Sequence, residues 1–346
     1  MKTLVFKAGT ETKTGLKGAD EIALALGPDK TPRIAAHVGK SVFYGNGGLW
    51  TLVASATVKG LQYLPVVDVY GISIVSGGVA DVVTGRGRTK GQVDQTYHGP
   101  WMTIIDDKNK VEPLQFHGFT EGAVRPVFET ENGDANIELW SKDGSYQVFN
   151  LVSGTYSNRN DHIGKTGEKL AVAPGGWRAF GGCASLDNSR VMKRGSKPVD
   201  VVDCDVYKGA GDDVYGYVGL CVKRTIQGKE TAYFAAEMCT GTIRVNKVTD
   251  GVALFAPGAL PSIGQASKMA RHSVQLCVIR GRVAAFWTLA GKIMAVDFDG
   301  AIAGQCKPMA ICDGSKAAVV ASGTGAMMAV IKKDGVSLLT ITTTKA

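Results

Sequence analysis

The sequence predicts an all-β protein, because short apolar segments alternate with glycine-containing turns along the chain. The stretch 274–341 shows this pattern most clearly, with turns at Arg280-Gly281-Arg282, Ala290-Gly291, Asp299-Gly300 and Asp334-Gly335. Gly is suited to such turns because it accepts the positive φ that a tight hairpin requires. The 45 glycines of the 346-residue chain are dispersed between apolar runs, which indicates many turns and many short strands.

The N-terminal part of the chain contains strands bounded by Gly, Pro and polar residues. We expect them over 3–6, 21–26, 33–38, 42–44, 49–54, 61–69, 72–75, 79–83, 101–105 and 111–116. The segment 21–26 also has helical propensity, but its alternation and the Gly27-Pro28 stop favour a strand. The segment 1–7 returns to charge after three apolar residues, so we expect a first strand and no secretion signal.

The remaining strands show internal similarity. We expect them over 136–140, 146–151, 199–206, 214–222, 231–236, 243–248, 252–255, 274–279, 283–287, 293–298, 310–312, 317–320, 327–331 and 336–341. The hairpin 136–151 can be laid on 327–341 so that Lys142-Asp143-Gly144 falls on Lys333-Asp334-Gly335. The segment 243–255 is interpreted as a further copy. Such similarity indicates a repeated unit.

One residue in each expected hairpin turn gives the length of the repeat. These markers are Gly60, Asn109, Gly144, Gly195, Gly251, Gly300 and Gly335. Their intervals average about 46 residues, as in four-stranded propeller blades. The chain therefore resembles β-propeller repeat proteins in general, without the signature motif of one family. The resemblance implies a single domain over 1–346 with about seven blades, or six without Gly195. A pair of β-sandwiches or a barrel would give similar strand spacing.

A β-propeller also predicts a role for the N-terminus. Closing the ring removes sheet edges that would otherwise pair with other chains, and a terminal strand commonly closes it. We expect 3–6 or 21–26 to pair beside 336–341, so that residues 1–30 contain the closing strand or an extension.

Cysteine usage and charge restrict the environment and the partners. The seven cysteines form no Cys-x-x-Cys pair: Cys183, Cys204, Cys221, Cys239, Cys277, Cys306 and Cys312. Several lie in apolar runs, which predicts free thiols and synthesis in a reducing cytoplasm. No run reaches the roughly 18 apolar residues of a membrane helix, so we expect no membrane partner. The formal net charge of +8 favours an anionic partner.

Basic residues in expected turns are the candidate binding residues. Turns of successive blades gather on two rims, so Arg86, Arg88, Lys193, Arg194, Arg280 and Arg282 would form a basic rim. Such a rim fits an acidic protein surface, and less well nucleic acid. The alternative is that these charges only keep a β protein soluble. Trp177 and Arg178 follow Pro174-Gly175-Gly176, and we expect them on a loop that contacts a sugar ring or a partner surface.

Catalytic and metal sites have less support in the sequence. Gly164-Lys165-Thr166 lacks the earlier Gly of a phosphate-binding loop, and the histidines are scattered singly. Asp203 and Asp205 are the candidate cation ligands, because alternation would place both on one strand face. We expect no cofactor and no catalytic residue.

These observations favour a non-enzymatic structural or interaction module that binds other proteins of a larger assembly, or an anionic surface or glycan. The Gly-, Ala-, Val- and Thr-rich composition resembles tail and decoration proteins of tailed bacterial viruses, which implies a virion component. One alternative is a carbohydrate-active propeller enzyme that uses members of Asp200, Asp203, Asp205 and Asp212. The other alternative is a sugar-binding lectin.

Overall fold

The computed structural model describes most of the chain as two compact units. Outside the described residues lie 1, 47–48, 56–65, 78–79, 91–95, 107, 109, 112–114, 117–126, 132–133, 141–144, 151–152, 154–155, 161–168, 182–187, 268–273 and 346. Unit 1 contains Met1–Thr12, Lys165–Lys333 and Ser337–Ala346, and unit 2 contains Lys13–Gly164 and Asp334–Val336. The turn markers Gly60, Asn109 and Gly144 fall outside the described residues, as does Cys183. The single domain over 1–346 stays a prediction.

The described strands form seven antiparallel sheets, as the hairpin signals predicted. Unit 1 holds β14 (Lys169–Ala173), β15 (Trp177–Gly181), β16 (Ser189–Lys193) and β17 (Val199–Val202); β18 (Val214–Arg224), β19 (Glu230–Met238), β20 (Thr242–Thr249), β21 (Val252–Ala253) and β22 (Ser262–Gln265); β23 (Gln275–Ile279), β24 (Arg282–Leu289), β25 (Lys292–Asp297) and β26 (Met309–Asp313); and β27 (Lys316–Ser322), β28 (Gly325–Lys332), β29 (Gly335–Lys345) and β1 (Leu4–Lys13). In unit 1, β14 lies against β18, β18 against β23, and β23 against β27.

Unit 2 holds the other three sheets. They are β2 (Ala19–Leu26), β3 (Pro32–Val38), β4 (Ser41–Asn46) and β5 (Leu49–Ser55); β6 (Val66–Gly77), β7 (Ala80–Lys90), β8 (Thr96–Asp106) and β9 (Gln115–Phe116); and β10 (Val127–Glu131), β11 (Asp134–Trp140), β12 (Ser145–Asn150) and β13 (Tyr156–Asn160). The segment 21–26 is a strand, as its alternation predicted, and it begins the first of these sheets.

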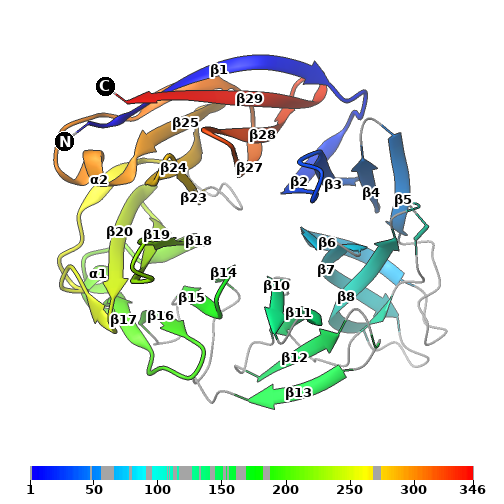
Figure 1. Cartoon of the computed structure of the whole chain (residues 1–346), viewed down its shortest axis with the longest axis horizontal. Helices are drawn as coiled ribbons and strands as arrows, with labels where there is room; N and C mark the ends of the chain where they lie inside the picture. Colours follow the sequence, from blue (N-terminus) through cyan, green and yellow to red (C-terminus); the bar gives the residue numbers. More distant parts are fainter. Residues whose placement is uncertain are drawn as a thin grey trace. The chain divides into compact units, whose positions relative to one another are not determined.

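The N-terminal strand completes the sheet formed by the C-terminal strands. The strand order is β1-β29-β28-β27, and β1 runs along β29 at the edge of the sheet (Figure 1). Leu4 and Phe6 are buried and pack in one cluster with Leu339 and Ile341. The prediction that a strand near residues 3–6 covers 336–341 is confirmed. Covering this strand removes a row of unpaired backbone groups from the sheet edge.

Two expected strand regions instead end in short helices. The strand expected over 199–206 ends at Val202, where Asp203 caps α1 (Cys204–Gly209) by accepting a hydrogen bond from the Val206 amide. The turn expected at Gly300 lies inside α2 (Phe298–Ile302), which Asp297 caps. Asp is a favoured N-cap residue because its carboxylate satisfies a free amide of the first turn. An Asp cap therefore begins a helix at both places, where the sequence predicted a continued strand at Asp203 and a hairpin turn at Gly300.

Two further properties bear on the environment of the protein. The six cysteines that the structure describes are all free thiols. Burial raises the pKa of Cys277 to about 12, which keeps that thiol protonated and unreactive. The described part of the chain contains no helix with the length and hydropathy needed to span a lipid bilayer.

Candidate functional site

The antiparallel strand order of unit 1 places two classes of turn at the same end of each sheet. Turns that join the first strand to the second lie beside turns that join the third to the fourth, because successive antiparallel strands reverse direction. We call this the turn end. In unit 1 it comprises 174–176 and 194–198, 225–229 and 250–251, 280–281 and 298–308, and 323–324.

Side-chain contacts connect the turn ends of the four neighbouring sheets of unit 1. Each contact joins a cationic side chain of one sheet to a carboxylate or carbonyl of the next, so the turn ends lie on one side of the unit. The contacts are Lys193–Glu230 (2.8 Å), Lys247–Asp299 (2.8 Å) and Arg280 Nε to the Thr324 carbonyl (3.0 Å).

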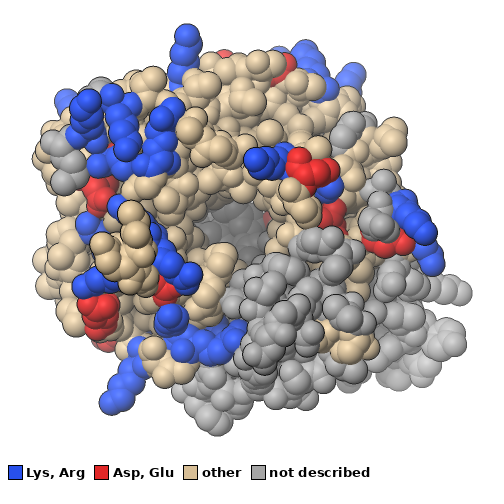
Figure 2. All heavy atoms as spheres, viewed as in Figure 1, with Lys and Arg blue, Asp and Glu red and all other residues tan. Residues whose placement is uncertain are grey.

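Cationic side chains gather on this unit. Figure 2 shows Lys and Arg over the region of α2 and, separately, over β16 and β17, with Asp and Glu side chains among them. Of the predicted rim residues, Lys193, Arg194 and Arg280 lie at the turn end. Arg86 and Arg88 do not lie in a turn. They belong to β7, which pairs with β8 through Arg86↔Pro100 and Arg88↔His98, because the β7–β8 hairpin is longer than the sequence predicted.

Arg282 is also at the turn end, but its side chain points into the unit. Only 12% of the side chain is exposed, and its guanidinium contacts both carboxylate oxygens of the fully buried Asp297, at 2.7 Å for Nη2–Oδ1. Asp297 also accepts hydrogen bonds from the amides of Leu4 (2.9 Å) and Gly300 (2.8 Å). Burial opposes ionisation of Asp297, but these donors outweigh it and lower the pKa of the carboxyl. Asp297, paired with Arg282, therefore fastens β1 and the first turn of α2 to β25.

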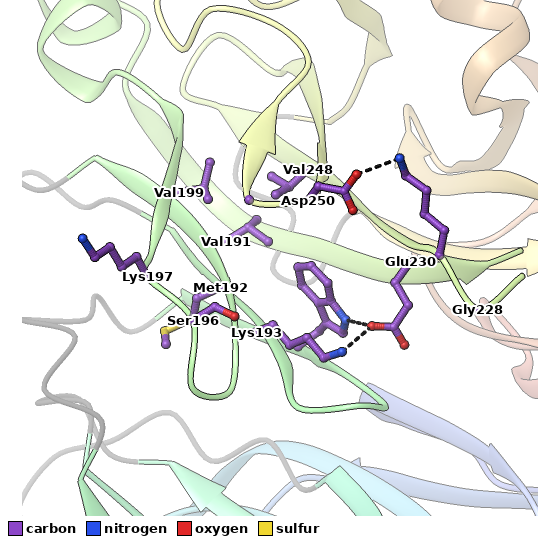
Figure 3. Close-up of a pocket in the computed structure, with 13 residues that line it drawn as sticks. Val191, Met192, Lys193, Ser196, Lys197, Val199, Gly228, Glu230, Val248 and Asp250 are labelled. Carbon is purple, nitrogen blue, oxygen red and sulfur yellow. Dashed lines mark hydrogen bonds and ion pairs between the residues drawn. The ribbon is translucent and has the colours of Figure 1, made fainter.

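A pocket of about 340 Å³ opens between sheet β14–β17 and sheet β18–β22 at the turn end (Figure 3). Its base is apolar and includes Val191 and Val248, which are almost fully buried, and the partly buried Val199. Its rim is polar and comes from three turns of the two sheets, 194–198, 225–229 and 250–251, and the residues next to them. The rim residues are Lys193, Ser196, Lys197, Gly228, Lys229, Glu230, Asp250 and Gly251.

Glu230 is the electrostatic centre of this pocket. Its carboxylate accepts hydrogen bonds from Trp177 Nε1 (2.9 Å), Lys193 Nζ (2.8 Å) and Arg224 Nε (3.0 Å). Partial burial opposes ionisation, but the three donors outweigh it and lower the pKa of Glu230 to about 2. Glu230 is thus ionised at neutral pH and neutralised by its own partners, so it does not repel an anion that enters the pocket.

Trp177 is placed differently from the sequence prediction. It is the first residue of β15 instead of a loop residue, and only 6% of it is exposed. Lys193 Nζ lies 6.0 Å from the centroid of its ring. Its neighbour Arg178 is 1% exposed, so it also differs from the exposed loop residue expected. The reason is the Gly175-Gly176 turn, in which both φ values are positive and the chain reverses directly into the strand. A contact between Trp177 and a ligand stays a prediction.

The outer part of the rim combines exposed apolar side chains with cations. Ile226 is fully exposed and Val252 is 67% exposed, on or beside the two turns that the Lys229–Asp250 ion pair (2.7 Å) joins. Lys197 lies on the other side of the pocket, and its amino group points outward (Figure 3). It forms no hydrogen bond or ion pair with any residue that the structure describes. The rim therefore offers a free cation and exposed apolar surface together.

The acidic residues of 200–213 have structural partners. Asp200 pairs with Arg190 (2.9 Å), Asp203 caps α1, and Asp212 accepts a hydrogen bond from Thr240 (2.6 Å). Asp205 lies exposed in the first turn of α1, so Asp203 and Asp205 do not share a strand face, as alternation had predicted. Among the described residues, no three His, Cys, Asp or Glu side chains are placed to share a metal ion.

Sequence reasoning did not identify Glu230, Lys229 or Asp250 as site residues. One local signal could have found Glu230: the turn 225–229 places it opposite Arg224 in the β18–β19 hairpin, where opposite charges attract. Its contacts with Trp177 and Lys193 come from a different sheet, 53 and 37 residues away in sequence. A single sequence carries no periodic signal for contacts of that kind.

Comparisons with known proteins support the fold. No protein-family model matches the chain, and no curated protein matches its sequence. Among solved structures, the chain is similar to the WD40 repeats of RRP9, with a TM-score of 0.54, 13% identity, and coverage of 98% of this chain and 97% of that chain. It is similar to U3-55K with a TM-score of 0.53, 14% identity, and coverage of 98% of each chain. These likenesses show the fold alone, and they confirm the β-propeller expected from the sequence.

Proposed function

We propose that the chain is a non-enzymatic interaction module that binds another protein at the turn end of sheets β14–β17 and β18–β22. The observation that carries the proposal is the exposure of Ile226 and Val252 beside a pocket with a cationic rim. Single exposed apolar side chains are ordinary, but their grouping around a concave site is typical of a docking surface. Turns on a rigid β scaffold are also where binding residues concentrate.

The mixed character of this surface favours a protein over nucleic acid. A nucleic-acid site would gather cations along the phosphate backbone and keep carboxylates away from it. Here Glu230 and Asp250 lie between the cations, and Ile226 would lose exposed apolar area against an apolar partner surface. Burial of that area stabilises a complex by about 25 cal/mol per Å² before the costs of association.

Site-specific crosslinking tests the proposal. A photoreactive amino acid replaces Ile226 at the turn end, and in a matched control it replaces Lys333, which is exposed between β28 and β29 at the opposite end of its sheet. After irradiation in cells that produce the protein naturally, position 226 should give one adduct of discrete mass and position 333 should not. Equal adducts at both positions, or none at 226, would exclude the turn end as the docking surface.

The finer form of the proposal is that the partner belongs to a virion, such as the tail or decoration of a tailed bacterial virus. The Gly-, Ala-, Val- and Thr-rich composition supports it. In a density gradient of infected-cell material, the chain should sediment with the particles. Recovery only at the position of the free protein would remove the virion from the proposal and leave the docking surface unaffected.

A further inference from the structure

The pocket between sheet β14–β17 and sheet β18–β22 has a chemistry that specifies its ligand. We infer that it takes an acidic peptide segment, with one large apolar side chain inserted between the two sheets and the flanking carboxylates held at the lysine rim. The inference rests on the proposed function and names the chemistry of the partner at that surface.

The size and the base of the pocket fit one apolar side chain. Its volume of about 340 Å³ lies at the lower end of the range of roughly 300–1,000 Å³ for small-ligand sites. Val191, Val199 and Val248 form an apolar base with no charged group among them. A Leu or Met side chain of the partner would therefore be desolvated without leaving an unpaired polar group.

The charge of the rim fits carboxylates on either side of that anchor. The two carboxylates of the rim already have cationic partners: Glu230 has Lys193 and Arg224, and Asp250 has Lys229. Lys197 supplies a further positive charge without a partner among the described residues. The rim is thus net positive, which attracts acidic residues and repels basic ones.

Sugar and nucleic acid fit this pocket less well. Stacking on a sugar ring or a base requires an exposed aromatic face. Trp177, the aromatic residue that lines the pocket, is 6% exposed, and its Nε1 donates to Glu230. Binding of a sugar or of nucleic acid in place of the peptide is therefore an outcome that would contradict the inference.

Binding of three synthetic peptides to the full-length chain tests the inference by fluorescence polarisation. The probe is a labelled peptide with one Leu between pairs of Glu. In the second peptide Ser replaces the Leu, and in the third Lys replaces every Glu. We expect binding of the first peptide, with an affinity that falls as salt rises. The other two should bind at least about tenfold more weakly, because each loses either the anchor or the charge.

Protein variants assign the binding to the pocket. Ser196→Trp fills the mouth of the pocket from an exposed turn position, and Lys197→Glu reverses the unpaired charge. Each variant should lower the affinity for the Leu peptide by about tenfold or more. Lys333→Glu, at the opposite end of its sheet, should change that affinity by less than about twofold. Unchanged thermal melting shows that the variants are folded.

Several outcomes would overturn the inference. Equal affinity for the Ser peptide would exclude an apolar anchor, and an equal effect of Lys333→Glu would exclude the pocket. No binding of the Leu peptide up to about 1 mM, or Lys197-dependent binding of an oligosaccharide or a single-stranded oligonucleotide in its place, would exclude an acidic peptide. Crosslinking at position 226 would still support a protein-docking surface in these cases, so failure of the inference is distinguishable from failure of the proposed function.

Discussion

Two carboxylates of unit 1, Asp297 and Glu230, accept hydrogen bonds from similar numbers of donors, but the donors differ in kind. Asp297 is fully buried and bonded to two backbone amides and one guanidinium. Glu230 is bonded to side chains alone, with 9% of its own side chain exposed at a pocket. Backbone donors cannot leave without local unfolding, whereas side-chain donors can change rotamer when a ligand arrives. The first arrangement fixes the fold, and the second is suited to binding.

Removal of the strand that Asp297 holds should have the largest effect. Deletion of residues 1–12 takes Leu4 and Phe6 out of the core, each worth about 1.5–3 kcal/mol of burial. It also exposes β29 as an edge strand and leaves Asp297 without the Leu4 amide. The truncated chain should be insoluble or should melt far below the full chain, as measured by circular dichroism and sedimentation.

The exposed neighbour Val5 provides the control for this deletion. Val5→Ser alters the same strand at a position that is 39% exposed, so the free energy of unfolding should change by less than about 0.5 kcal/mol. A truncated protein that stays monomeric and melts within a few degrees of the full chain would show that β1 does not stabilise the unit.

Loss of the Asp297 charge should be the next largest effect. Asp297→Asn leaves Arg282 with 12% of its side chain exposed and no countercharge on its partner. Breaking a buried ion pair on one side costs about 3–5 kcal/mol, measured by urea unfolding. Glu230→Gln should cost less, about 1.5–3 kcal/mol, the value of a hydrogen bond to a charged group. If the two variants lose equal free energy of unfolding, Asp297 does not stabilise the fold more than Glu230 does, which would contradict the comparison.

Acidification should weaken both carboxylate sites. The pKa of Glu230 is lowered from 4.5 to about 2, and the pKa of Asp297 is also lowered. Each group stabilises the fold above its ordinary pKa, and this contribution is lost as the pH falls toward the folded-state value. The free energy of unfolding should therefore decrease between pH 4.5 and 2, and less steeply in Glu230→Gln than in the wild type. If the two curves are parallel, the contacts of the folded state do not lower the pKa of Glu230.

The sequence carried enough information for the sheets but not for the contacts between them. Hairpins follow from local alternation and Gly-containing turns, so β28 was predicted to within two residues at each end and β29 to within one residue at its start, although β29 continues to Lys345. The turn markers were not equivalent positions, however. Gly195 and Gly251 join third and fourth strands, whereas Gly335 follows the turn between β28 and β29, the second and third strands counted from β27. The repeat length was still right because these markers fall in different sheets.

The candidate site was predictable only in part, for a related reason. Trp177 and Lys193 were identified from local features, a Gly-rich turn and a basic pair, and both line the pocket. Their common partner Glu230 comes from the next sheet, and no spacing rule connects them. Asp203 and the expected turn at Asp299-Gly300 were misread for the opposite reason. A single capping hydrogen bond starts a helix where alternation continues the strand pattern.

The smallest expected effect lies at the rim. It tests whether the Lys229–Asp250 ion pair stabilises the two turns or forms only because the backbone of the turns places the two side chains together. Asp250 has a φ of 53°, in the left-handed region, and its side chain is 69% exposed. Asn tolerates that backbone as Asp does, so Asp250→Asn should remove the ion pair at a cost below about 0.5 kcal/mol, as for exposed pairs generally. Asp250→Ala should cost about 1 kcal/mol or more, because the Cβ of an ordinary residue is strained at this φ. Urea unfolding of the two variants compares charge with backbone directly. If Asp250→Asn is as destabilising as Asp250→Ala, the ion pair itself holds the two turns together. The rim would then be too rigid to adapt its shape to a ligand.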